Sequence, residues 1–208
     1  MTDMIMIVVA FILGYLLGSL NIAIIVGKIY GKDIKSLGSK SAGLTNAHRV
    51  LGKSAAAFVL IGDIMKGILA CVIGLILGVY LYWGDVPESV SLLAAGTGAI
   101  IGHIWPVYFG FKGGKGGLTG LAVLFMINWI MALLCLGLFT LVIVLTRYVS
   151  LGTISCAILF AILSFIPTFG NPTLYFYVFS VLMAFIVIFK HRENIKRLLS
   201  GTENKLVI

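Results

Sequence analysis

The sequence has few charged residues. Asp, Glu, Lys and Arg make up 11% of its 208 residues and hydrophobic residues make up 61%, whereas soluble domains have about 25% and about 45–50%. A soluble protein of this length could not bury so much apolar surface, so the composition excludes one and predicts a protein embedded in the bilayer. No polar segment is long enough to fold separately, which predicts a single membrane-embedded domain over residues 1–208.

The sequence also lacks a secretory signal and has few cysteines. Met1 to Met6 contains Asp3 in place of a basic segment, and no small-residue cleavage site follows, so no secretory signal is predicted. The three cysteines, Cys71, Cys135 and Cys156, each lie in an apolar run. We therefore expect buried, unpaired thiols and neither disulfides nor metal ligands.

Two groups of enzyme signatures are missing. The chain has only 7 acidic residues and no cluster of aspartates, which argues against Mg²⁺-dependent phosphotransfer and predicts neither a metal nor a cofactor. No histidine is followed five residues later by aspartate, because Lys53, Tyr108 and Lys196 occupy those positions. The H-x4-D signature of many acyltransferases with soluble catalytic domains is therefore absent.

The apolar residues are gathered into runs that could cross a bilayer, for which about 20 residues are needed. One run is short and would cross as a half-length or tilted span. The runs are residues 4–27, 55–83, 89–109, 118–128, 129–146, 149–167 and 174–189.

The net charge of +8 would suggest nucleic-acid binding in a soluble protein, but here it indicates membrane topology, because cytoplasmic loops collect Lys and Arg. With seven spans and the N-terminus outside, the cytoplasmic segments hold 14 of the 15 Lys and Arg residues, whereas the outer loops hold Asp85 and Glu88 and no Lys or Arg. Six spans would place the basic tail and the basic first loop on opposite sides of the membrane and so break the positive-inside rule. We therefore predict an all-α polytopic fold with seven transmembrane helices and a cytoplasmic C-terminus.

The stretch FKGGKGGLTG at 111–120 has five glycines and two lysines. It is one residue too short for the G-x-x-x-x-G-K-[ST] nucleotide loop and follows an apolar helix, so a nucleotide site is excluded. A helix starting near Gly117 would still offer N–H groups to an anion. We predict a small-phosphate site, with a flexible linker as the alternative. Its residues are Lys112, Gly113, Gly114, Lys115 and Gly116.

The first polar loop, GSKSAGLTNAHR at 38–49, is the second candidate site. Short hydrogen-bonding side chains, flexible glycines and an arginine that can grip phosphate with two bonds occur together there. The alternative is a solvated loop that caps the next helix. The residues that we single out are Gly38, Ser39, Thr45, Asn46 and Arg49.

The tail, HRENIKRLLSGTE at 191–203, is the third candidate. Read as a helix, it places His191 and Asn194 on the same face as its apolar residues, whereas Arg197 belongs to a solvated, paired flank. The alternative is an amphipathic helix on the membrane surface.

Three ionisable residues lie within or at the ends of apolar runs. Asp63 and Lys66 are spaced i, i+3 inside one run, and charges at membrane depth are usually paired or functional. We expect a structural ion pair there. His103, near the end of the next run, is expected to be a hydrogen-bonded structural residue.

These segments together resemble the acyl-phosphate-dependent glycerol-3-phosphate acyltransferase family of bacterial membranes. The similarity covers nearly the whole chain through LLGSL at 16–20, GKDIKSLGS and GLTNAHRVLG within 31–52, GDIMKG at 62–67, GHIWPVYFGFKGGKG at 102–116, and the tail motif. The family's usual first-loop pattern is GSGNxGATN, so Lys40 stands in place of a glycine and is predicted to be strained if that glycine needs a positive φ. Asn21 stands where the family usually has proline.

The resemblance implies an integral enzyme of the bacterial inner membrane with its active site on the cytoplasmic face. It would transfer a fatty acyl group from acyl phosphate to the 1-hydroxyl of sn-glycerol 3-phosphate, giving lysophosphatidic acid and phosphate without a cofactor. Family roles would fall on Ser39, Arg49, His191 and Asn194 as catalytic residues, with Glu203 structural. The hydroxyl proton would pass to His191 or to the substrate's own phosphate.

A transporter or channel for small organic phosphates is the rival class, and a non-catalytic lipid-binding protein is the third. A transporter should show internal repeats and polar residues near the middle of several spans. The sequence has no clear repeat, and its polar groups gather at one side of the membrane. This pattern favours an enzyme whose partners are two small phosphorylated substrates and the membrane lipid, with no nucleic acid.

Overall fold

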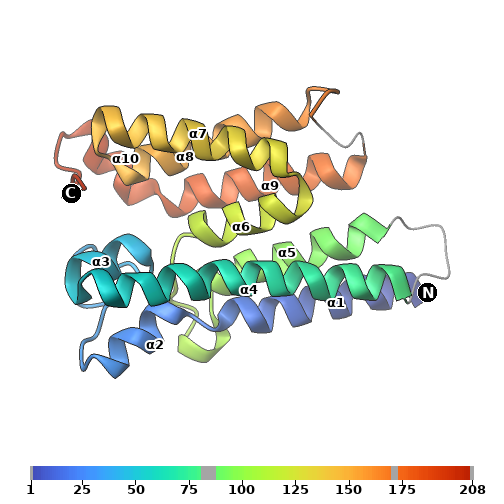
Figure 1. Ribbon diagram of the computed structural model, residues 1–208, viewed down its shortest axis with the longest axis horizontal. Helices are drawn as coiled ribbons and strands as arrows, with labels where there is room; N and C mark the ends of the chain where they lie inside the picture. Colours follow the sequence, from blue (N-terminus) through green and yellow to red (C-terminus); the bar gives the residue numbers. More distant parts are fainter. Residues whose placement is uncertain (1, 81–87, 170–172, 207–208) are drawn as a thin grey trace. The chain divides into compact units, whose positions relative to one another are not determined.

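A computed structural model of the chain describes residues 2–80, 88–169 and 173–206 (Figure 1). Every regular element within these ranges is a helix, so the all-α prediction is confirmed. The chain divides by its internal contacts into two compact units, Met1–Ile127 and Asn128–Ile208. Residues 81–87, which include Asp85 of a predicted outer loop, lie outside the described residues.

The first unit is built on three long helices, α1, α4 and α5, which pack side by side (Figure 1). Shorter helices join them and complete the unit. The elements are α1 (Thr2–Ser19), α2 (Ile22–Ile29), α3 (Leu44–Leu51), α4 (Lys53–Tyr80), α5 (Glu88–Ile104), η1 (Val107–Phe109) and α6 (Gly117–Ile127).

The backbones of α1 and α5 touch along a row of small residues. A Cβ atom on Gly14 or Gly18 would overlap the backbone of α5, and one on Gly98 or Gly102 would overlap the backbone of α1. Both pairs are spaced i, i+4 and so share one helix face. Such spacing lets membrane helices approach closely and gain dispersion contacts.

A single polar residue marks the break between α1 and α2. The side-chain oxygen of Asn21 accepts the N–H of Ile24 at 3.1 Å and so caps the N-terminus of α2. Its amide nitrogen donates to the Ala42 carbonyl at 3.3 Å. Asn21 is fully buried, so this capping residue also ties the helix break to the loop that precedes α3.

In the second unit α8 packs against both α7 and α9, and the short α10 follows α9 (Figure 1). Phe160 of α8 makes edge-to-face contacts with Phe176 and Phe179 of α9. α9 and α10 are bent by 58°, and His191 lies at the bend. The helices are α7 (Trp129–Thr146), α8 (Val149–Ser164), α9 (Leu174–Lys190) and α10 (Arg192–Leu199).

Length and composition make four of the described helices candidate membrane spans, or five if α9 with α10 forms one broken span. The four are Met4–Ile29, Lys53–Val79, Ser89–Phe109 and Trp129–Thr146. Two shorter apolar helices, Gly117–Ile127 and Val149–Ser164, fall below the usual spanning length. The fold is therefore that of a helical membrane protein, and the seven crossings stay a prediction. The three cysteines are free thiols, as expected.

Candidate functional site

Asn46 organises the first polar loop, which runs from the end of α2 to α3. Its side-chain oxygen accepts the N–H of Ser39 at 2.8 Å, and its amide nitrogen donates to the carbonyls of Ile34 at 3.0 Å and Leu37 at 3.1 Å. Asn46 is buried. The residue that the sequence suggests as a substrate contact thus holds the loop together from beneath.

The backbone of this loop depends on two left-handed residues. Gly38 has φ +58° and a Cβ there would also overlap the Asn46 side chain, so glycine is needed on both counts. Lys40 has φ +57°, a region that costs an L-residue roughly 1–2 kcal/mol. The strain predicted for Lys40 is therefore present, and its side chain is exposed.

Three other predicted residues of this segment reach the surface. Thr45 and Arg49 are spaced i, i+4 on α3 and so share one helix face. Arg49 is exposed, whereas Thr45 and Ser39 are half-buried. With Ser39 fixed by Asn46, the loop presents a hydroxyl and a guanidinium that can both donate to an anion.

The glycine-rich loop folds back over the C-terminus of α5. The N–H of Gly113 donates to the Ile104 carbonyl at 3.2 Å, and that of Gly114 donates to the His103 carbonyl at 3.0 Å. A Cβ on either glycine would overlap His103. These two glycines are needed for close approach, and their N–H groups satisfy carbonyls at the end of α5. The anion donors that remain in the prediction are the N-terminus of α6 and the lysines Lys112 and Lys115.

A buried ionic cluster lies below the glycine-rich loop. The ammonium of Lys66 is 2.8 Å from Oδ1 of Asp63, 2.8 Å from Nδ1 of His103 and 3.3 Å from the Leu20 carbonyl. Nδ1 of His103 also lies 3.6 Å from Oδ1 of Asp63, so the three side chains form one cluster, and the other ring nitrogen of His103 is Nε2. That nitrogen faces Gly114. The cluster therefore joins α4, α5 and the α1–α2 break to the underside of the loop.

In the second unit, Glu203 is the centre of the tail's hydrogen-bond network. Its Oε1 accepts from Asn194 at 2.7 Å and from Ser150 Oγ at 2.8 Å, and its Oε2 accepts from Arg197 at 2.7 Å. Burial raises the pKa of the Glu203 carboxyl, but the three hydrogen bonds and the charge of Arg197 outweigh it and lower that pKa overall. The carboxylate is thus a fixed anion that orients Asn194.

Two details of this network differ from the sequence interpretation or lie beyond it. Arg197 is paired, as expected, but its guanidinium binds Glu203 and is 34% exposed, so it belongs to the tail's network and not to a fully solvated flank. Ser150, at the start of α8, was not singled out, since its partner lies 53 residues further along the chain. Only the folded chain brings them together.

His191 is anchored at the bend between α9 and α10. Its Nδ1 is 2.8 Å from the Val187 carbonyl, and a carbonyl can only accept, so the Nδ1 proton is donated to it. In the neutral ring, Nε2 then carries the lone pair. His191 and Asn194 are both 4% exposed, which means that the tail presents two oriented polar groups from a buried position.

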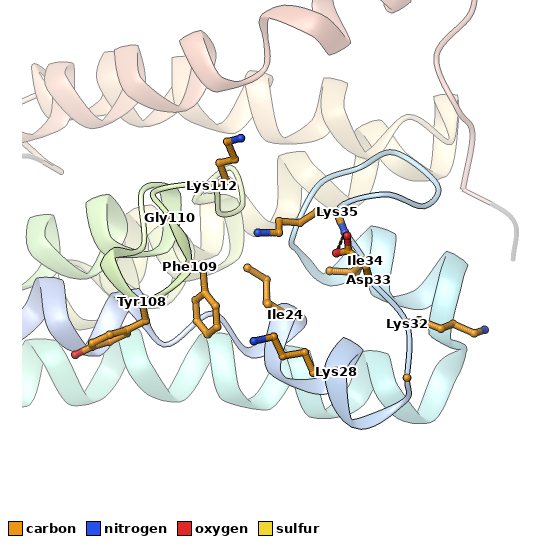
Figure 2. A pocket seen from close by; sticks show the side chains of 11 residues that line it. Ile24, Lys28, Lys32, Asp33, Ile34, Lys35, Tyr108, Phe109, Gly110 and Lys112 are labelled. Atoms are coloured by element: carbon orange, nitrogen blue, oxygen red, sulfur yellow. Dashed lines mark hydrogen bonds between the residues drawn. The ribbon is translucent and has the colours of Figure 1, made fainter.

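The first unit also contains a cleft of about 730 Å³ between the α2 end and the residues that follow α5 (Figure 2). Four lysines line it against one aspartate. The lining residues are Ile24, Lys28, Gly31, Lys32, Asp33, Ile34, Lys35, Tyr108, Phe109, Gly110 and Lys112. Of the residues predicted from the sequence, the cleft contains only Lys112. Among the described residues, no group of three His, Cys, Asp or Glu side chains could hold a metal ion.

The fold and these features define an all-helical membrane protein that carries cationic, donor-rich loops suited to phosphorylated ligands. Residues 8–201 match the family model described as glycerol-3-phosphate acyltransferase. The chain therefore belongs to the glycerol-3-phosphate acyltransferase family.

Curated relatives cover nearly all of the chain. The glycerol-3-phosphate acyltransferase of Thermoanaerobacter pseudethanolicus is 43% identical over 196 residues, which are 94% of this chain and 93% of the relative. That of Shouchella clausii is 44% identical over 197 residues, covering 93% and 92%.

Solved structures are similar as well. The crystal structure of PlsY (YgiH), an integral membrane glycerol 3-phosphate acyltransferase, in its glycerol 3-phosphate form superposes with a TM-score of 0.84 at 32% identity, over 97% of this chain and 96% of that one. The lysophosphatidic acid form gives a TM-score of 0.81 at the same identity, over 97% and 95%.

Proposed function

We propose that this protein transfers a fatty acyl group from acyl phosphate to the 1-hydroxyl of sn-glycerol 3-phosphate, giving lysophosphatidic acid and inorganic phosphate. One observation carries the proposal: the similar solved enzyme was obtained both in a glycerol 3-phosphate form and in a lysophosphatidic acid form. These two molecules are the acceptor and the product of this transfer. The acyl phosphate donor comes from the resemblance of the sequence motifs.

The chemistry suits a site without a metal. The 1-hydroxyl oxygen attacks the acyl carbonyl carbon, the bond between that carbon and the phosphate oxygen breaks, and phosphate leaves with the electron pair. Because phosphate is a good leaving group, positioning and charge stabilisation supply most of the catalysis. The protein's task is to hold two anionic groups side by side.

The proposed roles follow from donor type and exposure. Ser39, Thr45 and Arg49, with Lys112 and Lys115 in the loop before α6, would bind phosphate oxygens. Asn46 and the glycines Gly38, Gly113, Gly114 and Gly116 would shape those loops, and Asp63, Lys66 and His103 would support them. All of these roles are structural. Gly116 lies directly before the N-terminus of α6, which is itself a proposed anion-binding group.

His191 and Asn194 complete the proposed catalytic set. The Nδ1 bond to Val187 leaves Nε2 of His191 as a base, and Glu203 orients Asn194. The hydroxyl proton passes either to this Nε2 or to a phosphate oxygen of the substrate. A His191→Ala variant distinguishes the routes: loss of kcat assigns the proton to His191, and a rise in KM alone assigns it to the substrate.

For the topology we propose seven crossings, with the N-terminus outside and the C-terminus in the cytoplasm, in the bacterial inner membrane. The distribution of Lys and Arg supports this arrangement. In it the first polar loop, the glycine-rich loop and the tail share the cytoplasmic face, and the two compact units act as a single domain over residues 1–208. Cysteine accessibility at Lys53→Cys, Lys205→Cys and Val86→Cys tests the sidedness.

The reaction is tested with purified protein, palmitoyl phosphate and glycerol 3-phosphate, by measuring lysophosphatidic acid. Ser39→Ala and Arg49→Ala should each lower kcat/KM by roughly 100-fold or more, because each removes a charge-assisted donor. Ser36→Ala in the same loop and the exposed Arg192→Ala are the matched controls. Absence of product with folded protein, using acyl phosphate and then acyl-CoA, would overturn the reaction; unchanged activity in both variants would overturn the site.

A further inference from the structure

The cationic cleft of the first unit has a feature that a site for a small hydrophilic phosphate does not need, namely an apolar wall. Lys28, Lys35 and Lys112 line it together with Ile24 and Phe109. In Figure 2 the side chains of Lys28 and Lys35 extend toward Phe109 and Ile24. The Lys28 ammonium lies 5.5 Å from the centre of the Phe109 ring, so a cation and an aromatic surface are in direct contact.

The cleft also lies at the level where candidate membrane spans end. The span Met4–Ile29 ends one residue after Lys28, and the span Ser89–Phe109 ends at Phe109 itself. Tyr108, a residue type typical of the membrane–water interface, is 52% exposed at the cleft. The ends of two spans thus place the cleft beside the lipid headgroups.

The lysines of the cleft are not paired with carboxylates among the described residues. Within the described residues, no ion pair joins Lys28, Lys32, Lys35 or Lys112 to a carboxylate. The Lys32 ammonium donates a hydrogen bond to the Val50 carbonyl at 3.0 Å. In Figure 2 its side chain points away from those of Lys28 and Lys35. Asp33 is the one acidic side chain of the lining, so the cleft is strongly cationic.

We propose that this cleft binds the phosphate headgroup of an anionic membrane phospholipid. Lys28 and Lys35 bind the phosphate oxygens, Lys112 lies at the rim, and Ile24, Phe109 and Tyr108 contact the glyceride and the start of the chains. The site goes beyond the acyl transfer proposed above, because Ser39, Thr45 and Arg49 do not line the cleft and Lys112 is the one proposed substrate contact that it shares. It gives the enzyme a direct contact with the charge of the membrane that its product enters.

The test is native mass spectrometry of the detergent-solubilised full chain with phosphatidylglycerol or phosphatidylcholine of identical chains. The wild type should retain phosphatidylglycerol the more strongly. A Lys28→Gln, Lys35→Gln double variant should weaken that retention by roughly 10- to 30-fold, because each lysine near an anionic lipid contributes a few-fold to tenfold. The matched control, Lys53→Gln with Lys205→Gln, loses the same charge outside the cleft and should retain the lipid.

Each other outcome overturns the proposal. Equal retention of the two lipids, or equal weakening in the control variant, would show that the binding is unspecific. Displacement of phosphatidylglycerol by inorganic phosphate or glycerol 3-phosphate at equal concentration would assign the cleft to a small phosphate. Since the readout is binding, it is independent of whether the proposed acyl transfer is observed.

Discussion

The carboxamide of Asn46 holds the backbone of Ser39, seven residues earlier in the chain, through a 2.8 Å hydrogen bond from the Ser39 N–H. Two further bonds from the same side chain fix the carbonyls of Ile34 and Leu37. The backbone that carries the Ser39 side chain is therefore positioned by a buried residue that need not touch a ligand. A loop held in this way should lose its structure as a whole when its central side chain is removed.

The first prediction concerns that side chain. Asn46→Ala removes three hydrogen bonds and should lower the free energy of unfolding by about 3 kcal/mol, at roughly 1 kcal/mol each, and abolish most acyl transfer. Thermal unfolding and lysophosphatidic acid formation measure the two effects. Asn204→Ala, at an exposed position of the tail, is the control. A stable but inactive Asn46→Ala protein would instead make Asn46 a direct substrate contact.

The second prediction is a gain of stability at Lys40. Because Lys40 has φ +57°, Lys40→Gly should stabilise the protein by roughly 1 kcal/mol through relief of the left-handed strain. The neighbouring Ser41 does not have a positive φ, so Ser41→Gly should not stabilise. Lys40→Ala removes the same side chain but keeps the strain. If Lys40→Ala raises the unfolding temperature as much as Lys40→Gly, the gain comes from charge and the strain argument fails.

The third prediction separates glycines needed for close approach from glycines that are not. A Cβ on Gly114 would overlap the His103 ring and the Ala42 carbonyl, whereas one on Gly137 in α7 meets nothing within 4 Å. Gly114→Ala should therefore destabilise by roughly 1–3 kcal/mol and impair activity. Gly137→Ala should be neutral or stabilise by up to about 1 kcal/mol. Equal unfolding temperatures for the two variants would contradict this geometry.

The fourth prediction is a pH dependence that comes from Glu203. Since the folded protein lowers the pKa of this carboxyl, its contribution to stability is fully present above the unfolded pKa of about 4.3. It is lost as the pH falls through the lower, folded value. In Glu203→Gln this loss should disappear, so the unfolding temperatures of the two proteins should differ at neutral pH and converge in acid. Parallel curves across the acid range would contradict the role of Glu203.

The helical class and the approximate helix positions could be predicted because long apolar runs need no tertiary information. The Asp63–Lys66 ion pair, at 2.8 Å, could also be predicted from the sequence, because the i, i+3 spacing places both residues on one helix face. The strain at Lys40 could be predicted because this sequence has lysine at a position where the family pattern has glycine. In each case the deciding interaction lies within a few residues of the chain.

Long-range partners could not be predicted. Glu203 meets Ser150 across 53 positions, and Lys66 meets His103 across 37, and no periodicity links such pairs. The glycines Gly113 and Gly114 suggested exposed N–H donors, but the fold uses those donors on the end of α5. Whether a glycine N–H binds an anion, or the glycine is needed for close backbone packing, depends on what packs against it.

The contact between the α1 and α5 backbones has a consequence for how the enzyme handles its lipids. Where Gly14 and Gly18 lie directly on the opposing main chain, there is no room for a hydrocarbon tail. The seam between these two helices is therefore closed to acyl chains. A molecule with an acyl chain must therefore reach and leave the proposed phosphate-binding loops along other faces of the protein. This helix pair restricts the directions from which lipids can approach.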